Sequence, residues 1–396
     1  MTKEPNYLEL TLVVCNTCEF RCDYCCILDS LGDKEANADD GISFLKWQLD
    51  MPKNVHKRVV IEFFGGEPLM NFSYIQDIIS YVKNHYDDRD ISFRLFTNGL
   101  NGPLDLPDEY TWSNIDEIIV SLDGEYTDNL DRTKSRKAYN KIIKNIEYYR
   151  DNDYPFGVAF IVHPDTELER VFNYFKDLGI IYYTFEVASL WNDNKDNGIN
   201  KEFLFNTFKF IYENVYLYNV EDDFVNPRVV SMPKEFLASY SYSGYSCFDT
   251  NRALSLNGNV YSCRDLAIGE EQWMKRQSSD SSVFFRSNDY VPFNIKDLQL
   301  DKSKDTYTDT AKEYDNVSPC WIKAFEFKHF ARIEPDWYTD EEFQTLIVKP
   351  MYELLWLTLS VYDRDKEKDK KYFEHYSQFV AGYGQVLKEY EQYVRS

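Results

Sequence analysis

Strand and helix patterns alternate along the first half of the chain, and this alternation limits the fold more than any other feature. Runs rich in β-branched and aromatic residues predict six strands, at Leu8–Val14, Val59–Phe64, Ser92–Thr97, Glu117–Leu122, Gly157–Val162 and Ile180–Val187. Helical periodicity predicts helices between them, at Ile42–Leu49 after an Asp39–Asp40 cap, Tyr74–His85, Ala138–Tyr149 and Glu167–Leu178. Single strands separated by helices are typical of βα units around a parallel sheet. Six units are fewer than the eight of a closed barrel, so the sequence predicts an α/β fold with a partial, TIM-like (β/α)6 barrel.

The composition changes after this region. Residues 226–335 are richer in Ser, Asn, Asp and Tyr, with short strands and a hairpin at Leu256–Val260, and we predict a small cysteine-containing domain there. Residues 336–396 return to helical periodicity, with a kink at Pro350 and a charged break at Asp363–Lys371. The predicted domains are therefore a barrel at 1–225, the cysteine domain at 226–335 and a helical segment at 336–396.

Charge and hydropathy exclude several classes of partner. The formal net charge of −23 argues against a nucleic-acid partner, because phosphate binding needs clustered Lys and Arg. The N-terminus lacks the charged and apolar regions of a signal peptide, and the longest apolar run, near Met351–Tyr362, is broken by Glu353 and is too short to cross a bilayer. We therefore expect a cytoplasmic protein with no membrane contact.

Cysteines are crowded near the first predicted strand. Five of the 8 Cys fall between Cys15 and Cys26, which in a large protein of a reducing compartment points to metal ligation. Cys18, Cys22 and Cys25 form a C-x3-C-x2-C loop whose thiolates can bind three irons of a cubane and leave the fourth iron open. If Cys15 joined them, the same loop would be a fully ligated ferredoxin site or a zinc site.

Three further motifs follow the next three predicted strands. They are Gly65-Gly66-Glu67-Pro68, Thr97-Asn98-Gly99 and Ser121-Leu122-Asp123-Gly124. Parallel α/β folds place ligands at the carboxyl ends of their strands, so the motifs and the cysteine loop should meet at one edge. The glycine pair would let bare backbone approach a ligand, and Glu67 would face an ammonium group. Each motif alone is a common turn or strand end, but the ordered set is specific.

Taken together, the C-x3-C-x2-C loop with Tyr24 before its last cysteine and the three strand-end motifs resemble the radical S-adenosylmethionine (radical SAM) superfamily. The resemblance implies a [4Fe–4S] cluster on Cys18, Cys22 and Cys25, reduced by an external donor such as flavodoxin or ferredoxin. It implies that SAM binds the open iron and is cleaved to a 5′-deoxyadenosyl radical. The implied SAM-binding residues are Tyr24, Gly65, Gly66, Glu67, Pro68, Thr97, Asn98, Ser121 and Asp123, with the last two facing the ribose.

The sequence departs from the family pattern at a few positions. The first cluster cysteine is often followed by Asn in the family, whereas Glu19 follows Cys18 here. Cys15 and Cys26 lie outside the pattern. We expect each either to be packed as a small hydrophobic side chain or to donate a hydrogen atom to a substrate radical.

Cys247, Cys263 and Cys320 form a second set. The C-x10-G-x4-C spacing through Gly258 resembles the start of the SPASM and twitch extensions of radical SAM enzymes, and Phe293-Asn294-Ile295, Asp297-Leu298 and Pro319-Cys320 resemble their later part. The resemblance implies one auxiliary iron–sulfur cluster on these three cysteines, because Lys323 stands where a further cysteine is expected. The alternatives are a zinc site with His329 and three buried thiols.

The resemblance to this branch favours an enzyme that abstracts hydrogen from a peptide or protein, for a cross-link, an epimerisation or an oxidation. Because the first strand begins near residue 7, we expect no separate leader-recognition domain before it. One alternative is a twitch-type dehydrogenase that acts on a small molecule, for which an enclosed pocket would be expected. The other is a non-catalytic iron–sulfur or zinc protein.

Overall fold

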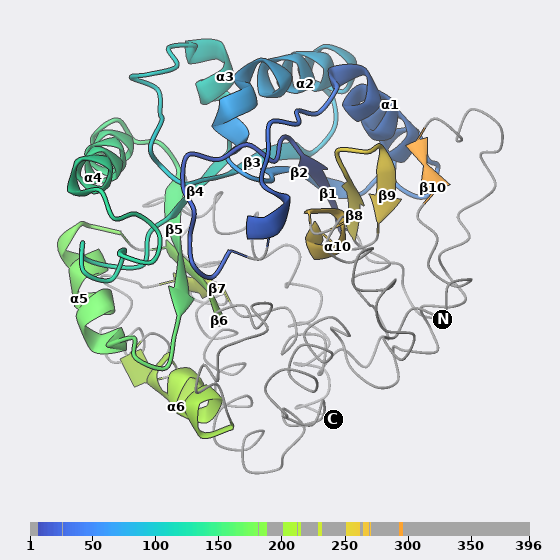
Figure 1. The fold of residues 1–396 in the computed structure, drawn as a ribbon. Coiled ribbons are helices and arrows are strands. Elements are labelled where there is room, and N and C mark those ends of the chain that lie inside the picture. The colour runs from blue at the N-terminus through green and yellow to red at the C-terminus, as the bar shows by residue number, and fades with distance from the viewer. Residues whose placement is uncertain are drawn as a thin grey trace, which may run out of the picture. The chain divides into compact units, whose positions relative to one another are not determined.

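The described part of the chain divides into two compact units. Figure 1 labels their helices and strands. The first contains the described residues up to 119, residues 140–146 and the described residues between 245 and 313; the second contains residues 120–139 and the described residues between 147 and 244. The computed structural model describes residues 7–25, 27–180, 182–187, 201–211, 213–214, 229–231, 251–261, 264–268, 270 and 293–295. No helix in these ranges is both long and apolar enough to span a bilayer.

A mainly parallel sheet forms the centre of the first unit. Its strands, in spatial order, are β10 (Phe293–Asn294), β9 (Asn259–Tyr261), β8 (Asn251–Leu254), β1 (Tyr7–Val13), β2 (Arg58–Phe64) and β3 (Ile91–Thr97). Strands β8, β1, β2 and β3 are parallel, whereas β8–β9 and β9–β10 are antiparallel pairs. The predicted hairpin is therefore present, and its first strand lies beside β1.

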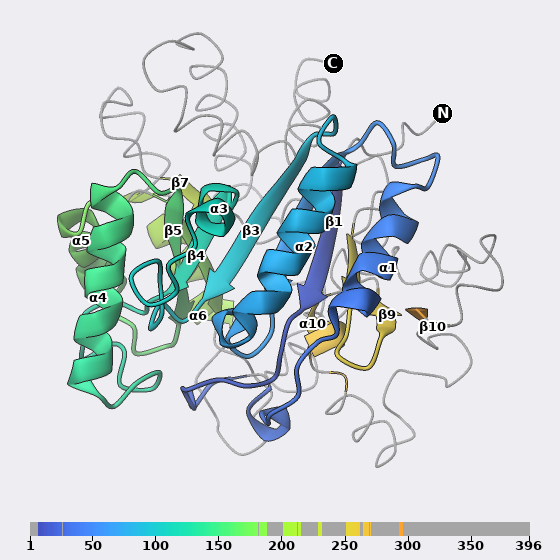
Figure 2. The same cartoon turned by 90° about the horizontal axis from the view of Figure 1, so that it is seen from above.

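Helices cover one face of this sheet (Figure 2). The helical segments that lie wholly in the unit are η1 (Leu28–Ser30), α1 (Ala38–Leu49), η2 (Pro68–Asn71), α2 (Phe72–His85), α3 (Glu109–Ser113) and α10 (Arg264–Ile268). Of these, α10 contacts the opposite face of the sheet. The Lys83 ammonium of α2 lies 5.6 Å from the ring centroid of Phe93, and the Phe93 ring stacks on that of Phe63. The alternate residues of β2 and β3 on this face form the apolar core, namely Val59, Ile61, Phe63, Phe93 and Leu95.

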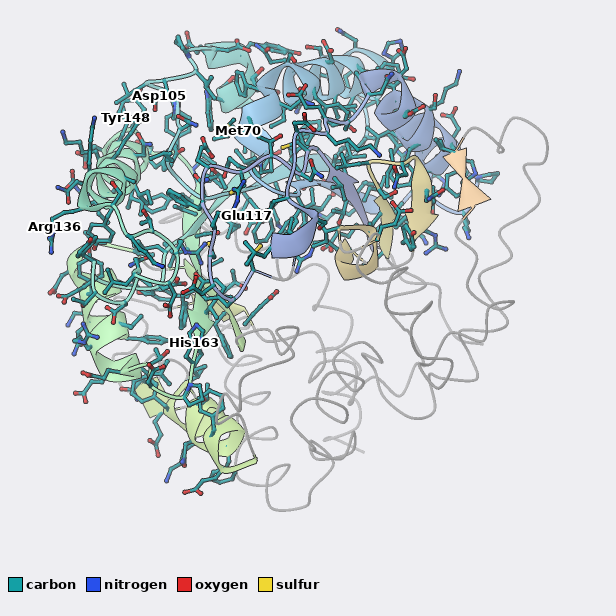
Figure 3. All side chains as sticks on the ribbon, viewed as in Figure 1. Met70, Asp105, Glu117, Arg136, Tyr148 and His163 are labelled. Atoms are coloured by element: carbon teal, nitrogen blue, oxygen red, sulfur yellow. The ribbon has the colours of Figure 1, made fainter. Side chains whose placement is uncertain are left out.

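Neighbouring residues on the same strands face the opposite side and carry a buried ionic cluster. The Arg94 guanidinium contacts Glu9 of β1 at 3.3 Å, Glu62 of β2 at 3.4 Å and Glu117. Glu117 lies on this side of the strands (Figure 3). A second cation, Arg264 of α10, lies 3.6 Å from Glu62. Because buried charges are stable only when they are paired, this cluster fixes how neighbouring strands face one another.

The second unit continues the βα alternation. Strand β4 (Glu117–Ser121) begins in the first unit and ends in the second, and α4 (Arg136–Asp151) has residues in both. The remaining elements are β5 (Phe156–Val162), α5 (Leu168–Asp177), β6 (Tyr182–Val187), α6 (Lys201–Ile211) and β7 (Val229–Ser231). Strands β5, β6 and β7 pair in parallel, and the rings of Phe160, Phe172 and Phe175 pack between β5 and α5.

The predicted α/β class is confirmed, and all six predicted strands are present with ends within two residues of the prediction. One local prediction was wrong. The α1 helix is capped by Asn37, whose side chain accepts the backbone N–H of Asp39, and Asp39 and Asp40 lie within the first turn. The domain limits at 225/226 and 335/336 fall outside the described residues and stay predictions. The same holds for the helices predicted in residues 336–396, with the kink at Pro350 and the charged break.

Replacing Arg94 tests the ionic cluster. The Arg94→Leu substitution would leave three buried carboxylates without their shared cation, so we expect the free energy of unfolding to fall by about 3–5 kcal/mol in urea denaturation. The matched control is Arg150→Leu. The Arg150 ion pair with Asp151 is exposed, and its loss should cost about 1 kcal/mol or less. Equal losses in the two variants would contradict the structural role given to Arg94.

Candidate functional site

The cysteine loop begins where β1 ends. Cys18, Cys22 and Cys25 are half-buried and unlinked thiols, and the Cys25 N–H donates to the Cys22 carbonyl at 3.0 Å in a tight turn. Asn16 closes the loop at its base, because its side chain donates to the Ser30 carbonyl at 2.7 Å and accepts from the Lys34 N–H at 2.8 Å. These contacts close the base of the loop at the sheet edge. The half-buried Tyr24 lies within the loop.

The donor set of this loop fits an iron–sulfur cluster. Within the described ranges, no three His, Cys, Asp or Glu side chains converge on a single ion position. A cubane does not require such convergence, because each thiolate binds its own iron. Burial raises the pKa of the Cys18 thiol to about 11, although the N–H of Phe20 and the Asn98 amide act in the opposite direction. Metal binding at Cys18 must therefore displace a proton.

The glycine pair after β2 packs against the base of the loop. Gly65 has φ +141°, and a Cβ there would lie 2.4 Å from the Cys15 carbonyl oxygen. A Cβ on Gly66 would lie 2.3 Å from the Thr17 carbonyl oxygen. The Gly66 N–H donates to that Cys15 oxygen at 2.7 Å. These glycines thus allow the protein's own backbone to approach, a requirement that the sequence did not reveal.

Glu67 follows the glycines and is fully buried. One carboxylate oxygen accepts from the Leu69 N–H at 3.1 Å and the Thr97 hydroxyl at 2.8 Å, and the other accepts from the Asn98 N–H at 2.6 Å. Burial raises the pKa of Glu67 to about 7, and these donors oppose the rise. The described contacts of this carboxylate are with the protein, so contact with a SAM ammonium stays a prediction. Pro68, which is also buried, begins η2.

The Thr97-Asn98-Gly99 motif at the end of β3 contacts both neighbouring motifs. Thr97 and Asn98 donate to Glu67, and the Asn98 side chain also reaches the cysteine loop, 3.9 Å from the Cys18 sulfur. The Gly99 carbonyl accepts from the Asn145 side chain at 2.8 Å. The cysteine loop and the two motifs that follow β2 and β3 are therefore brought together at one edge of the first unit, as the parallel sheet predicted.

Cys15 is buried at this junction. Its thiol donates to the Glu67 carbonyl at 3.1 Å and contacts the Thr17 carbonyl at 3.5 Å. Burial raises the pKa of this thiol to about 12. The geometry gives Cys15 a packing contact with the glycine motif, while its role as a hydrogen-atom donor stays a prediction. Cys26, the other candidate, is outside the described residues.

The Ser121-Leu122-Asp123-Gly124 motif belongs to the second unit. The buried Asp123 carboxylate is paired with Arg132 through two contacts of 2.9 and 3.1 Å, and it accepts the Ile161 N–H at 3.0 Å. Ser121 is half-buried. Their contacts with a ribose stay predictions, and the Arg132 partner was not foreseen from the sequence.

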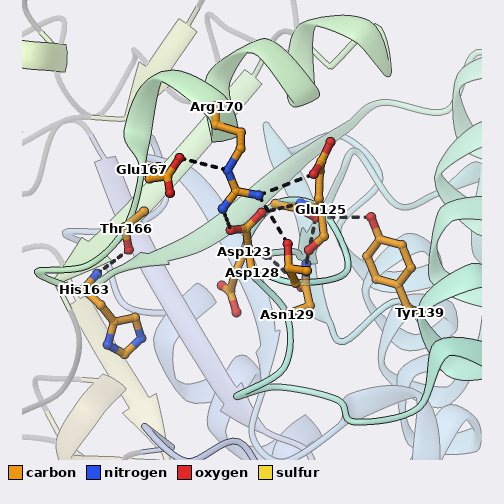
Figure 4. A network of polar contacts seen from close by, with 11 residues as sticks. Asp123, Glu125, Asp128, Asn129, Tyr139, His163, Thr166, Glu167 and Arg170 are labelled. Atoms are coloured by element: carbon orange, nitrogen blue, oxygen red, sulfur yellow. Dashed lines mark hydrogen bonds and ion pairs between the residues drawn. The ribbon is translucent and has the colours of Figure 1, made fainter.

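The loop after this motif is fixed by a polar network (Figure 4). Asn129 accepts the Asp123 N–H and donates to the Gly124 carbonyl, and Arg170 of α5 reaches Glu125, Asp128 and Glu167. This network holds the turn that follows β4 against α5.

The second cysteine set is represented only by its hairpin. Cys247, Cys263 and Cys320 fall outside the described residues, as do Lys323 and His329. Gly258, at the hairpin turn, has φ +78°, which favours glycine. Glu270 accepts from Asn257, Asn259 and the Tyr261 hydroxyl, and Lys34 after the cysteine loop donates to Asn257. The hairpin is thus attached to the loop that carries Cys18, Cys22 and Cys25.

Comparison with known proteins agrees with this arrangement. The family model of the radical SAM superfamily matches residues 12–199, which contain the four strand-end motifs. These residues therefore match the radical SAM superfamily. The family implies a [4Fe–4S] cluster and SAM, and the thiols of the cysteine loop are the donors that fit such a cluster.

Relatives of the radical SAM region are distant. The radical SAM cyclopropyl synthase TigE of Paramaledivibacter caminithermalis is 25% identical over 181 residues, which is 42% of this chain and 37% of TigE. The chain matches about half, or less, of the length of the curated relatives.

Solved structures share the fold at low identity. The structure of anSMEcpe with bound AdoMet has a TM-score of 0.62 and 16% identity over 93% of this chain and 99% of that one. SuiB from Streptococcus suis, bound to its precursor peptide SuiA, has a TM-score of 0.53 and 14% identity over 76% of this chain and 66% of SuiB. These similarities show a shared fold, in which the described sheet corresponds to a partial, TIM-like α/β barrel.

Substituting Gly66 tests the packing of the glycine motif. In Gly66→Ala the new methyl group would meet the Thr17 carbonyl, which cannot move without shifting the cysteine loop. We expect a loss of about 2 kcal/mol in the free energy of unfolding and fewer irons bound per chain after anaerobic reconstitution.

Gly32→Ala is the matched control for this substitution. Its Cβ would lie 3.3 Å from the Asn16 side chain, a milder approach than the 2.3 Å at Gly66, so both quantities should fall less than in Gly66→Ala. An unchanged iron content and stability in Gly66→Ala would contradict the proposed packing.

Proposed function

We propose that this chain is a radical SAM enzyme that abstracts hydrogen from a peptide or protein substrate. The observation that carries the proposal is the hydrogen-bonded junction of the cysteine loop with the motifs after β2 and β3. Glu67 joins the second motif to the third, and Asn98 joins the third motif to the loop. A loop used only to store metal would have no need of this junction.

Each motif has a definite task in this proposal. Cys18, Cys22 and Cys25 would hold the cluster, and the cluster would bind the amino and carboxylate groups of SAM. When bound, a reduced cluster would supply the electron for cleavage of SAM to methionine and a 5′-deoxyadenosyl radical. The backbone after β2 binds the amino acid end of SAM, with Glu67 holding that segment against β3. Ser121 and Asp123 bind the ribose, and Arg132 keeps the Asp123 carboxylate in place.

Similarity to peptide-binding radical SAM proteins supports a peptide substrate. SuiB is solved with a precursor peptide, and anSMEcpe is solved with the Cp18Cys peptide as well as AdoMet. The C-x10-G-x4-C spacing of this chain agrees with the same branch, and the reaction on the peptide would be a cross-link, an epimerisation or an oxidation. The auxiliary cluster on Cys247, Cys263 and Cys320 is part of this proposal. Its support is the hairpin between the first two of these cysteines, whose strand β8 pairs with β1.

Anaerobic turnover tests the proposal. Reconstituted and reduced protein should convert SAM to 5′-deoxyadenosine, and the yield should rise with candidate peptides. In Cys22→Ser one of the three iron ligands is replaced, so the product should fall to the level without protein. Mass spectrometry of the peptide and chromatography of 5′-deoxyadenosine are the measurements.

The outcomes of this assay separate the alternatives. If 5′-deoxyadenosine formed only with small metabolites, the peptide substrate would be contradicted and the alternative, a twitch-type dehydrogenase that acts on a small molecule, would be favoured. A Cys22→Ser variant that binds and cleaves SAM as well as the unaltered protein would contradict the assignment of the cysteine loop. Asp33→Asn, which changes an exposed carboxylate beyond that loop, is the control and should leave product formation unchanged.

A further inference from the structure

Glu19 replaces the residue that often follows the first cluster cysteine, and its carboxylate is held from two sides. One oxygen accepts from the Asn98 side chain at 3.1 Å, and the other accepts from the Asn101 side chain at 2.9 Å. Both asparagines belong to the segment that follows β3. An exposed carboxylate directly after a cluster ligand is thus tied to a second motif of the site.

The orientation of the Asn98 amide is fixed by its own contacts. Its oxygen accepts the Leu100 N–H at 2.8 Å, which identifies the other atom as the NH2 group. That group has two hydrogens. One is donated to Glu19, and the nitrogen lies 3.9 Å from the Cys18 sulfur, which also accepts the Phe20 N–H at 3.4 Å. Glu19 therefore uses one hydrogen of the amide and turns the other toward the thiol.

The other side of Glu19 is anchored in the same way. The Asn101 oxygen accepts from the Lys141 ammonium at 3.4 Å, so that the amide NH2 of Asn101 faces Glu19. Lys141 is itself paired with Asp105 at 2.8 Å. These contacts form a chain from Asp105 to Cys18 in which every amide has a defined direction.

Hydrogen bonds and charges next to cluster sulfurs set the reduction potential of the cluster. A donor to a ligand sulfur stabilises the extra electron of the reduced state, whereas a nearby carboxylate opposes that electron. The site contains both: the Asn98 amide acts as the donor, and Glu19 both orients that amide and adds a negative charge.

We propose that Glu19 is a positioning residue that directs the Asn98 amide at the Cys18 sulfur and thereby sets the reduction potential of the cluster. The inference rests on the proposed function, because it requires the cluster to be held by Cys18. Glu19 acts through Asn98 and need not touch the substrate.

A redox titration of the reconstituted full chain, followed by electron paramagnetic resonance, tests this proposal. The signal that changes when SAM is added belongs to the cluster with the open iron, which separates it from an auxiliary cluster. In Glu19→Gln the charge is removed while an acceptor for Asn98 remains. At the solution potential that half-reduces the unaltered protein, the ratio of reduced to oxidised cluster should rise at least about threefold, or about 28 mV for a one-electron couple.

Two further variants separate positioning from charge. Glu19→Ala removes the charge and also releases the amide, so its ratio should rise less than that of Glu19→Gln. Asn98→Ala removes the donor, and its ratio should fall below that of the unaltered protein. The control Asp33→Asn removes an exposed carboxylate beyond the cysteine loop and should leave the ratio unchanged.

The failures are distinguishable. If the unaltered protein has no signal that responds to SAM, the proposed function fails, and this inference fails with it. If the Glu19 variants bind the cluster but keep the ratio of the unaltered protein, only this inference is overturned. An equal rise in Glu19→Gln and Glu19→Ala would show that Glu19 acts by charge alone and would overturn the positioning role.

Discussion

The rest of the site depends on the hydrogen bonds that the buried carboxylate of Glu67 accepts. Its oxygens hold the Thr97 hydroxyl and the Asn98 N–H, while the Glu67 carbonyl accepts the Cys15 thiol from the end of β1. One residue thereby joins the carboxyl ends of β1, β2 and β3. A carboxylate without these donors would be costly to bury, and burial indeed raises its pKa to about 7. The segment after β2 is consequently stable in this position only when β3 and its motif are also in place, which couples the site to the packing of the sheet.

The two faces of the first sheet serve this site in different ways. Phe63 and Phe93 face α2, where burial of apolar surface stabilises the unit without directional contacts. The opposite face carries Arg94 with its three glutamates, and ion pairs of that kind depend strongly on geometry. Arg264 extends the cluster, because its guanidinium also lies 4.4 Å from the ring centroid of Phe64, the residue before the glycine pair. The helix after the hairpin is thus attached to the strand that leads into the site.

Local patterns predicted most of the elements, and contacts between distant segments account for what was missed. The ends of β2 and β3 agreed with the prediction because their apolar runs stop at Gly65 and Asn98. The α1 cap was misplaced because Asn37, Asp39 and Asp40 all satisfy the same pattern, and only the backbone decides which of them accepts the N–H. The glycine pair indicated a close approach, but a sequence does not say which atoms approach, and these are the carbonyls of Cys15 and Thr17. The pairing of β8 with β1 joins residues far apart in the chain, for which periodicity gives no signal.

The same limit explains why Glu19 could be read from the sequence only as a departure from the family pattern. If Cys18 binds the proposed cluster, a carboxylate beside it would oppose reduction of that cluster unless its charge is engaged by other groups. The structure supplies those groups from a segment that the sequence places about eighty residues away, through the amides of Asn98 and Asn101, and Lys141 fixes the second amide. The exposed carboxylate thereby gains two directional partners and becomes part of the junction between the loop and β3. A substitution at one motif position is accommodated by residues outside the motif, so the function of such a position follows from its contacts and not from its agreement with a pattern.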